Sequence, residues 1–183
     1  MSTDLATRTI LLGIARGAIT AAVRGEQAAP FEDAPILREV RGAFVTLMHT
    51  QRLRGCIGRV VPDSPLSRML PEVAVLSATE DPRFSPVSPG ELAALHIEIS
   101  LLTVPVLLSD RSLIEIGRHG LMVALGGRRG LLLPQVATEY GWSAEEFLAQ
   151  TCVKAMLPAD AWQRDDVSVH TFESEIIEEE TTR

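Results

Sequence analysis

The stretch Leu53-Arg54-Gly55-Cys56-Ile57-Gly58 places one of the chain's two cysteines between two glycines and directly after an arginine. The pattern predicts a strand that returns from the preceding one, so Arg54 and Cys56 share a face at a separation of roughly 7 Å. A guanidinium at that distance favours the thiolate, which is the reactive form of cysteine. Gly55 and Gly58 have no side chain to pack, which in a strand marks a bulge or the close approach of another group. The spacing predicts a site but names no reaction.

Cys56 admits two interpretations. In the first, it is a nucleophile or ligand beside a positive charge at the edge of a cleft. In the second, it is a packed thiol at a place where the neighbouring glycines let two backbones meet. The neighbouring sequence supplies no obvious base, so catalysis by a Cys-His pair is unsupported. Both interpretations stay open.

The motif Asp81-Pro82-Arg83-Phe84 is a rigid elbow with a charged pair and an aromatic ring. In a structural interpretation, Asp81 caps the preceding helix, Phe84 anchors in the core and Arg83 lies over the ring. In a functional interpretation, Arg83 lies near Cys56 and donates hydrogen bonds to an anion or a carboxylate. The functional interpretation puts Asp81 and Arg83 in the same binding site as Arg54, Gly55 and Gly58, with Cys56 as the candidate catalytic residue. Both interpretations of the motif stay open.

Both motifs resemble those of the AMMECR-type domain family, known in prokaryotes as AmmeMemoRadiSam system protein A. Three further stretches resemble it in the same order, and together they span the chain from about residue 5 to the end: Arg41–Leu47, Gly130–Ala137 and Cys152–Ala155. The family has no settled activity. The resemblance implies one domain over residues 1–183, with two lobes around a cleft that the Cys56 motif lines. Met156 departs from the family pattern because glycine is common at this position, which puts a tight backbone approach there in doubt.

The resemblance implies partners, namely a Memo-like protein and a radical-SAM enzyme. Two functions follow as hypotheses. The first is a binding or accessory protein that presents a small molecule or a protein segment to those partners. The second is a small-molecule enzyme in which Cys56 acts as nucleophile or ligand, with Arg54 and Arg83 orienting an anionic substrate. The sequence offers few polar catalytic pairs, which favours the first hypothesis.

The composition excludes several other classes of protein. A net charge of -7 argues against a general nucleic-acid binder, although Arg52, Arg54 and Arg59 allow a local basic patch. No segment approaches the roughly 18 apolar residues that cross a bilayer, and the N-terminus lacks the pattern of a secretory signal. Two cysteines in apolar surroundings do not form a disulfide framework. We therefore expect a cytoplasmic protein without a cofactor.

The hydrophobic pattern predicts strands in hairpins separated by helices, which indicates an α+β fold of antiparallel hairpins with flanking helices. Thr3 or Asp4 caps a first helix that Gly25 ends after Arg24. A second helix is expected to have Ser64 as its N-cap and Pro65 as its first residue, to end by Glu80, and to be kinked or shifted by Pro71. The other elements expected are a strand over 95–101, a hairpin of 120–125 and 130–133, a helix from the Ser143 capping box to about Met156, and a strand over 167–172. Glu178–Glu180 is expected to be a solvated tail.

Other polar clusters are given structural interpretations. His96, Glu98 and Ser100 alternate along one strand, too far apart for a catalytic triad, and are expected to face solvent. The four histidines show no paired zinc spacing, so no metal site is expected. Cys152 lies on an apolar helical stripe and is expected to pack in the core, beside a solvated Lys154.

Overall fold

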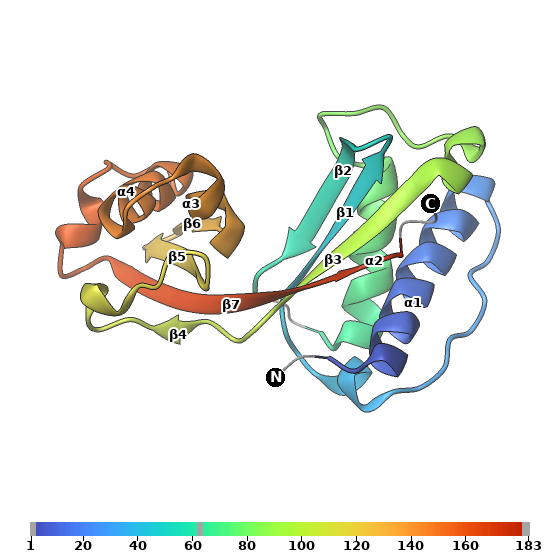
Figure 1. Ribbon diagram of the computed structural model, residues 1–183, viewed down its shortest axis with the longest axis horizontal. Coiled ribbons are helices and arrows are strands. Elements are labelled where there is room, and N and C mark those ends of the chain that lie inside the picture. Colours follow the sequence, from blue (N-terminus) through green and yellow to red (C-terminus); the bar gives the residue numbers. More distant parts are fainter. Residues whose placement is uncertain (1–2, 62–63, 181–183) are drawn as a thin grey trace. The chain divides into compact units, whose positions relative to one another are not determined.

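The computed structural model describes residues 3–61 and 64–180 of the chain (Figure 1). The chain forms two compact units. Of the described residues, the first contains those up to Leu102 and 175–180, and the second contains Thr103–Ser174. Each unit combines antiparallel strands with helices, so the predicted α+β class is confirmed. Strand β7 (Ser168–Glu178) contributes its first part to the second unit and its end to the first.

The first unit is a sheet with two helices on one face (Figure 1). Its strands run in the order β2-β1-β3-β7. The bounds of its elements are Leu5–Arg24 for α1, Ala43–His49 for β1, Arg52–Arg59 for β2, Leu66–Thr79 for α2 and Leu95–Leu102 for β3. Alternate residues of the strands point toward the helices and form the core, among them Val45, Leu47, Ile97 and Ile99. The opposite face carries a mixture of side chains, with Phe44, Thr46 and Met48 of β1 opposite Ser100, Glu98 and His96 of β3.

Helix α1 begins and ends where the sequence predicts. The Asp4 carboxylate accepts a hydrogen bond from the Thr7 N–H at 2.9 Å, and Gly25 ends the helix with a left-handed φ of 69°. By length and composition, its 20 residues could cross a membrane, contrary to the expectation that no segment could. The buried core helix of a soluble protein passes the same test, and α1 packs its apolar stripe into the first unit. The structure is consistent with a soluble α+β domain.

Helix α2 ends at Thr79 as predicted but begins differently. Pro65 is its N-cap and Leu66 its first residue, so the prediction that Ser64 caps this helix is wrong. Pro71 lies inside the helix and does not shift its start. Short 3-10 helices precede and follow α2 in this unit, at Pro35–Arg38 and Pro89–Ala94.

The second unit has its own sheet and core. Its strands run in the order β4-β7-β5-β6. The bounds of its remaining elements are Val106–Leu107 for β4, His119–Leu125 for β5, Arg128–Leu132 for β6, Pro134–Tyr140 for α3 and Ala144–Lys154 for α4, with 3-10 helices at Arg111–Leu113 and Ala161–Gln163. The predicted hairpin and the Ser143 capping box are both present. Cys152 is fully buried in the core of this unit, as predicted.

The sequence analysis missed helix α3. It begins at Pro134 and ends at Tyr140, and the next residue, Gly141, has a left-handed φ of 64°. Proline at the start and glycine just after the end are the standard boundary signals of a helix. These two residues would have located α3, whose seven residues are too few to show a clear apolar stripe.

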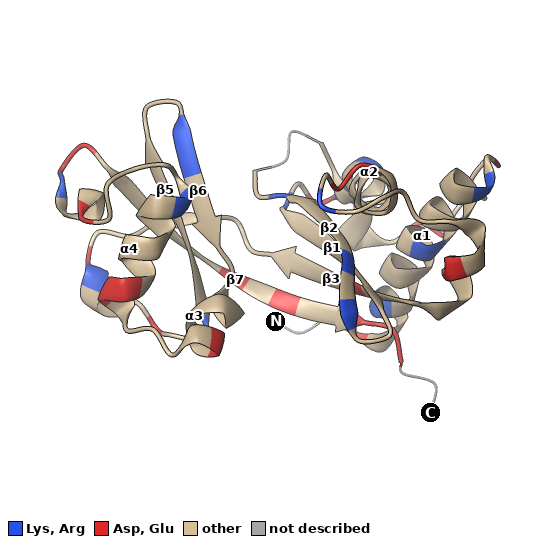
Figure 2. Cartoon of the chain, turned by 90° about the horizontal axis from the view of Figure 1, so that it is seen from above, with Lys and Arg blue, Asp and Glu red and all other residues tan. Residues whose placement is uncertain are grey.

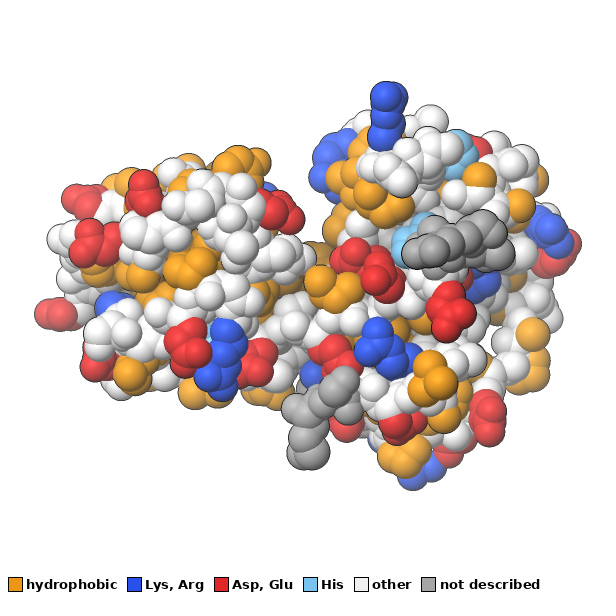
Figure 3. All heavy atoms as spheres, viewed as in Figure 1, with side chains coloured by type: hydrophobic (Ala, Val, Ile, Leu, Met, Phe, Trp, Pro, Cys, Tyr) orange, Lys and Arg blue, Asp and Glu red, His pale blue; other side chains and the backbone are white. Residues whose placement is uncertain are grey.

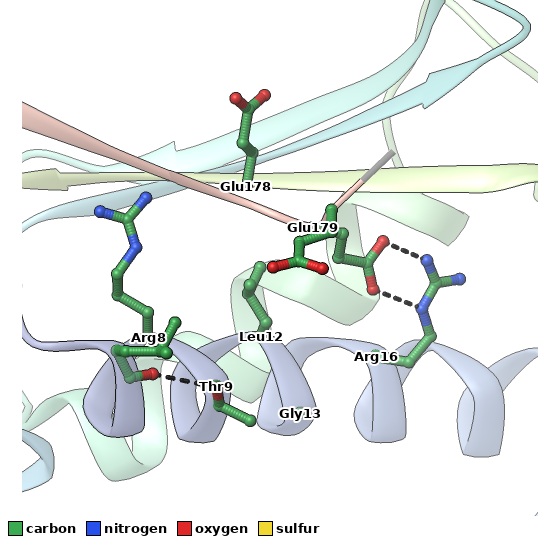
Figure 4. Close-up of a pocket in the computed structure, with 9 residues that line it drawn as sticks. Arg8, Thr9, Leu12, Gly13, Arg16, Glu178 and Glu179 are labelled. Atoms are coloured by element: carbon green, nitrogen blue, oxygen red, sulfur yellow. Dashed lines mark hydrogen bonds and ion pairs between the residues drawn. The ribbon is translucent and has the colours of Figure 1, made fainter. Parts of the chain in front are cut away.

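Strand β7 is longer than predicted and ends at Glu178, so the expectation of a solvated acidic tail is wrong for Glu178 and Glu179. Glu179 accepts two hydrogen bonds from the Arg16 guanidinium, one of them at 2.9 Å from Nε, and a third from the Ile97 N–H (Figure 4). Glu178 points to the other face of the strand, where it pairs with His96 at 3.6 Å (Figure 4). Glu179 is therefore bound to α1 and to the sheet of the first unit.

Met156 occupies a glycine-like conformation. Its φ is 57°, in the left-handed region that glycine adopts readily and other residues rarely. A tight backbone approach does occur in this segment, but the residue that allows it is Gly130 and not residue 156. A Cβ on Gly130 would lie 2.2 Å from the Ala155 nitrogen, so β6 and the end of α4 are in contact there only because residue 130 is glycine.

We expect Met156→Gly to stabilise the protein. Glycine relieves the left-handed strain, and the Met156 side chain is 78% exposed, so little packing is lost. The expected gain is about 1 kcal/mol in the free energy of unfolding. Urea denaturation followed by circular dichroism measures it, and a loss of stability would show that the Met156 side chain makes a contact that this conformation hides.

Candidate functional site

The Cys56 motif lies on the edge strand of the first unit and contains a β-bulge. Leu47 pairs with Gly55 and Met48 with Leu53, so Arg54 is the extra residue on β2. Beyond the bulge, Cys56 pairs with Thr46. A bulge re-aims the side chains on either side of it. The simple alternation that placed Arg54 beside Cys56 therefore does not hold through this stretch.

Cys56 lies in a row of side chains across three strands. Thr46 pairs with Cys56 on one side and with Glu98 on the other. This row lies on the face of the sheet opposite α1 and α2, because its neighbours Val45 and Leu47 are fully buried in the core on the helix side. All three side chains of the row are partly exposed.

The two glycines of the motif allow close packing. A Cβ on Gly55 would lie 2.0 Å from the carbonyl oxygen of Ser77 in α2. A Cβ on Gly58 would lie 2.4 Å from the ring of Phe44. The prediction of a close approach at these glycines is thus confirmed, and the group that approaches is the protein itself.

Asp81 and Arg83 hold the main chain of Cys56. The Cys56 N–H donates to Asp81 Oδ2 at 2.8 Å, and Arg83 Nη2 lies 3.4 Å from the Cys56 carbonyl oxygen. Arg83 also donates to both oxygens of Asp81, at 2.9 Å from Nε and 2.6 Å from Nη2. These hydrogen bonds hold the pKa of Asp81 well below its usual range. The two motifs, 25 residues apart, form one structure at the edge of β2.

Arg83 retains donors that the protein does not use. Its side chain is 53% exposed and lies over the Phe84 ring, with the guanidinium carbon 5.4 Å from the ring centre. Nε and Nη2 make the bonds to Asp81 and Cys56, and no hydrogen bond from Nη1 is found in the described part of the chain. Of the structural interpretation, only the placement of Arg83 over the ring is confirmed. Glu80, not Asp81, is the C-cap of α2, because the Asp81 carboxylate is bound to Cys56 and Arg83. Phe84 is partly exposed and does not belong to the core.

The surroundings of the Cys56 thiol favour its protonated form. Burial raises the pKa of Cys56, and this effect outweighs the hydrogen bond from Thr46 Oγ1 at 3.3 Å and the charge of Arg83, which both lower it. Asp81 and Glu98 raise the pKa further. In the residues that the structure describes, no histidine hydrogen-bonds to this sulfur. The arrangement does not produce a reactive thiolate at neutral pH.

Arg54 binds the segment that follows α2 and not the Cys56 thiol. Its Nε donates to Glu91 Oε1 at 2.7 Å, and Nη1 donates to the carbonyl oxygen of Ser85 at 2.8 Å. Glu91 also accepts from the Ser88 N–H, and these bonds, led by the one from Arg54, lower the pKa of Glu91 to about 2. The side chain of Arg54 is only 14% exposed. The guanidinium that acts on the Cys56 thiol is therefore that of Arg83.

Sequence reasoning missed several partners of the motif. Ser77 accepts the Ile57 N–H at 2.9 Å and lies 2.8 Å from the Val45 carbonyl oxygen, which ties α2 to both strands. Thr46 and Glu91 were also not singled out. Thr46 lies within one of the family-like stretches, so its register opposite Cys56 was a usable signal, whereas the pairing of Glu91 with Arg54 had none.

Ser100 does not face solvent, contrary to expectation. Its residue is 1% exposed, and its Oγ has no hydrogen-bond partner in the described residues. His96 and Glu98, on the same face, are partly exposed, in line with the expectation that this side of the strand faces solvent. The alternating pattern of β3 correctly predicted that His96, Glu98 and Ser100 share one face of the strand. It did not predict that Ser100 is buried on that face.

Two hollows of the first unit lie along α1, and Cys56 lines neither of them. One, of about 760 Å³, lies between α1 and residues 178–180 (Figure 4), and its two arginines are paired, Arg8 with Glu175 and Arg16 with Glu179. Another, of about 670 Å³, lies between α1 and residues 28–32. Across residues 3–61 and 64–180, no three His, Cys, Asp or Glu side chains are grouped to hold a metal ion.

Comparison with known proteins decides the family. The sequence model of the AMMECR1 family matches residues 12–177, which is most of the chain. The chain belongs to the AMMECR1 family. Its relatives include a protein of Methanothermobacter thermautotrophicus, 47% identical over 93% of both chains, and one of Thermococcus kodakarensis, 45% identical over 94% of this chain and 90% of the relative.

A solved structure supports the fold of this AMMECR1 protein. The crystal structure of the uncharacterized protein PH0010 from Pyrococcus horikoshii superposes with a TM-score of 0.84 at 44% sequence identity. The superposed residues cover 93% of this chain and 90% of the PH0010 chain. The names of these relatives state no activity, so the function must be argued from the geometry of the site.

Proposed function

We propose that this AMMECR1 protein is a cytosolic binding or accessory protein whose partner contacts Arg83 beside the Cys56 motif. The observation that carries the proposal is the Asp81–Arg83 pair. It uses one side of the guanidinium to brace the edge strand, leaves Nη1 without a hydrogen bond among the described residues and leaves half of the side chain exposed. A braced guanidinium with unused donors suits a carboxylate or phosphate group of a partner.

The partners we propose are those that the family resemblance implies, a Memo-like protein and a radical-SAM enzyme. The test measures the affinity of the purified chain for the Memo-like protein of the same organism by isothermal titration calorimetry. Arg83→Lys keeps a charge beside Asp81 but loses the second guanidinium edge, so we expect binding about tenfold weaker. Arg52→Lys, at an exposed arginine of the same unit, is the matched control and should bind like the wild type. Equal binding by both variants would contradict the proposal.

A second function, an enzyme that uses Cys56, has one observation in its favour. The thiol is only partly buried and lies next to Arg83, which could orient an anionic substrate. The discriminating experiment is a screen of ester, amide and phosphate substrates with the wild type and Cys56→Ser. Turnover that disappears in the variant would favour the enzyme.

Alkylation tests the state of the thiol directly. Because the pKa of Cys56 is raised, its thiolate fraction at neutral pH is lower than that of an ordinary thiol, and its reaction with iodoacetamide should be slower than that of the unfolded chain. The rate should rise as the pH passes the ordinary thiol range. Cys56 should still react before the fully buried Cys152. Mass spectrometry of the native protein measures both rates, and a Cys56 that reacts faster than the unfolded chain would indicate an activated nucleophile.

A further inference from the structure

A small polar pocket lies beside the first two turns of α2. Its volume is about 220 Å³, and its lining residues are Arg59, Ser64, Arg68 and Glu72. Arg59 ends β2, and Ser64 comes just before Pro65, the N-cap of α2. Arg68 and Glu72 are four residues apart and lie on the same side of that helix. Figure 2 shows the basic and acidic residues of β2 and α2, which supply the charges of this pocket. We call it the α2 pocket.

The hydroxyl group of Ser64 points to a ligand. The residue is only 7% exposed, and its Oγ has no hydrogen-bond partner among the described residues. Buried polar groups in native proteins are nearly always hydrogen-bonded, so an exception calls for an explanation. Because Ser64 lines the α2 pocket, a ligand there that accepts a hydrogen bond would give this hydroxyl its partner.

The guanidinium of Arg68 supplies an unpaired positive charge. The residue is exposed, and it makes no ion pair among residues 3–61 and 64–180. Arg59, by contrast, donates from Nη2 to Glu72 Oε1 at 2.6 Å. The two arginines outweigh the one glutamate, so the side chains that line the α2 pocket carry a net positive charge.

The start of α2 adds to the preference for an anion. Its N-cap, Pro65, offers no side-chain hydrogen bond, and its first turn contains no acidic residue. The helix itself therefore carries nothing that offsets the positive end of its dipole. The Leu66 N–H already donates to the Glu39 carbonyl oxygen at 2.9 Å, so the helix contributes its dipole and not that donor.

The rest of the chain does not attract anions. Its net charge is -7, and on the face shown in Figure 3 acidic and basic side chains are interspersed on both units. Charges further away than about 10 Å are largely screened at ordinary salt concentrations. Binding of an anion must therefore depend on the donors inside the α2 pocket.

We propose that the α2 pocket binds a phosphate group, either of free phosphate or of a small phosphorylated metabolite. Arg68 donates to the phosphate oxygens, the Ser64 hydroxyl donates a further hydrogen bond, and Arg59 adds positive charge from β2. Donors at separate positions suit the tetrahedral oxygens of a phosphate better than a planar carboxylate. Neither Cys56 nor Arg83 lines the pocket, so this site goes beyond the proposed function and does not rest on it.

The test titrates the isotope-labelled full chain with sodium phosphate at constant ionic strength and follows its backbone amide signals by NMR. We expect saturable shifts that are largest over residues 64–72. Arg68→Gln removes the unpaired charge and should weaken binding at least about tenfold. Arg24→Gln, at an exposed arginine of α1, is the control with the same charge change and should bind within about twofold of the wild type.

The variant Ser64→Ala separates a role in binding from a role in folding. Without phosphate, it should unfold at the temperature of the wild type or above, because no hydrogen bond within the described residues is lost. With phosphate, its affinity should be about threefold lower, because the ligand loses one donor. Wild-type affinity in this variant would overturn the assignment of Ser64 to the site.

Glycerol phosphate distinguishes the two sources of the phosphate group. Binding at least about tenfold tighter than that of inorganic phosphate would assign the site to a phosphorylated metabolite, and otherwise the ligand is free phosphate. The proposal is overturned by shifts that do not saturate, by acetate binding as tightly as phosphate, or by wild-type affinity in Arg68→Gln. Because the titration needs no Memo-like protein, its failure is separate from failure of the proposed function.

Discussion

Asp81→Ala should destabilise the protein by about 3 kcal/mol in the free energy of unfolding. The Asp81 carboxylate is 3% exposed and accepts the Cys56 N–H, the Arg83 N–H and two guanidinium bonds. Its removal leaves the edge strand without its brace and Arg83 without its partner. Urea denaturation of the two proteins at neutral pH measures the difference.

The pH dependence provides the control for this prediction. The folded-state pKa of Asp81 is depressed, so its stabilisation is fully present above the unfolded pKa of about 4 and is lost as the pH falls through the folded value. The difference between wild type and Asp81→Ala should therefore shrink as the pH drops below about 4. A difference under about 0.5 kcal/mol at neutral pH would show that the brace contributes little.

The sequence predicted best where the determinants are local. The Asp4 cap, the Gly25 stop and the Ser143 capping box each act within a few residues, and the structure has all three. The alternation from Leu95 identified β3 for the same reason. Such signals depend on neighbours along the chain, which the sequence displays directly.

Predictions failed where a side chain finds its partner far away in the sequence. Glu179 was taken for a tail residue because nothing near it suggests Arg16, 163 positions earlier. Arg54 was assigned to the thiol because the bulge that re-aims it is visible only in the pairing with β1. Its true partner, Glu91, lies 37 residues further on. The candidate site residues were thus identified, but their roles required the register of the strands.

Gly55→Ala should have a comparable effect on stability, and it tests whether the Cys56 motif is built around a backbone contact. The new Cβ would lie 2.0 Å from the Ser77 carbonyl oxygen, far inside contact distance. Ser77 cannot withdraw easily, because its side chain is hydrogen-bonded to the backbone of both strands. Strand β2 and helix α2 must then separate, at a cost of about 3 kcal/mol.

The matched control for Gly55→Ala is Gly17→Ala in α1. A Cβ there meets no atom within 4 Å, so alanine should stabilise the helix by about 1 kcal/mol. Chemical denaturation of both variants gives opposite signs if the contact at Gly55 is as close as the structure has it. Wild-type stability in Gly55→Ala would mean that β2 can move away from α2 freely. Asp81 and Arg83 would then have to hold the Cys56 motif without support from α2. The proposal that Arg83 is presented to a partner on a rigid strand would lose its main structural support.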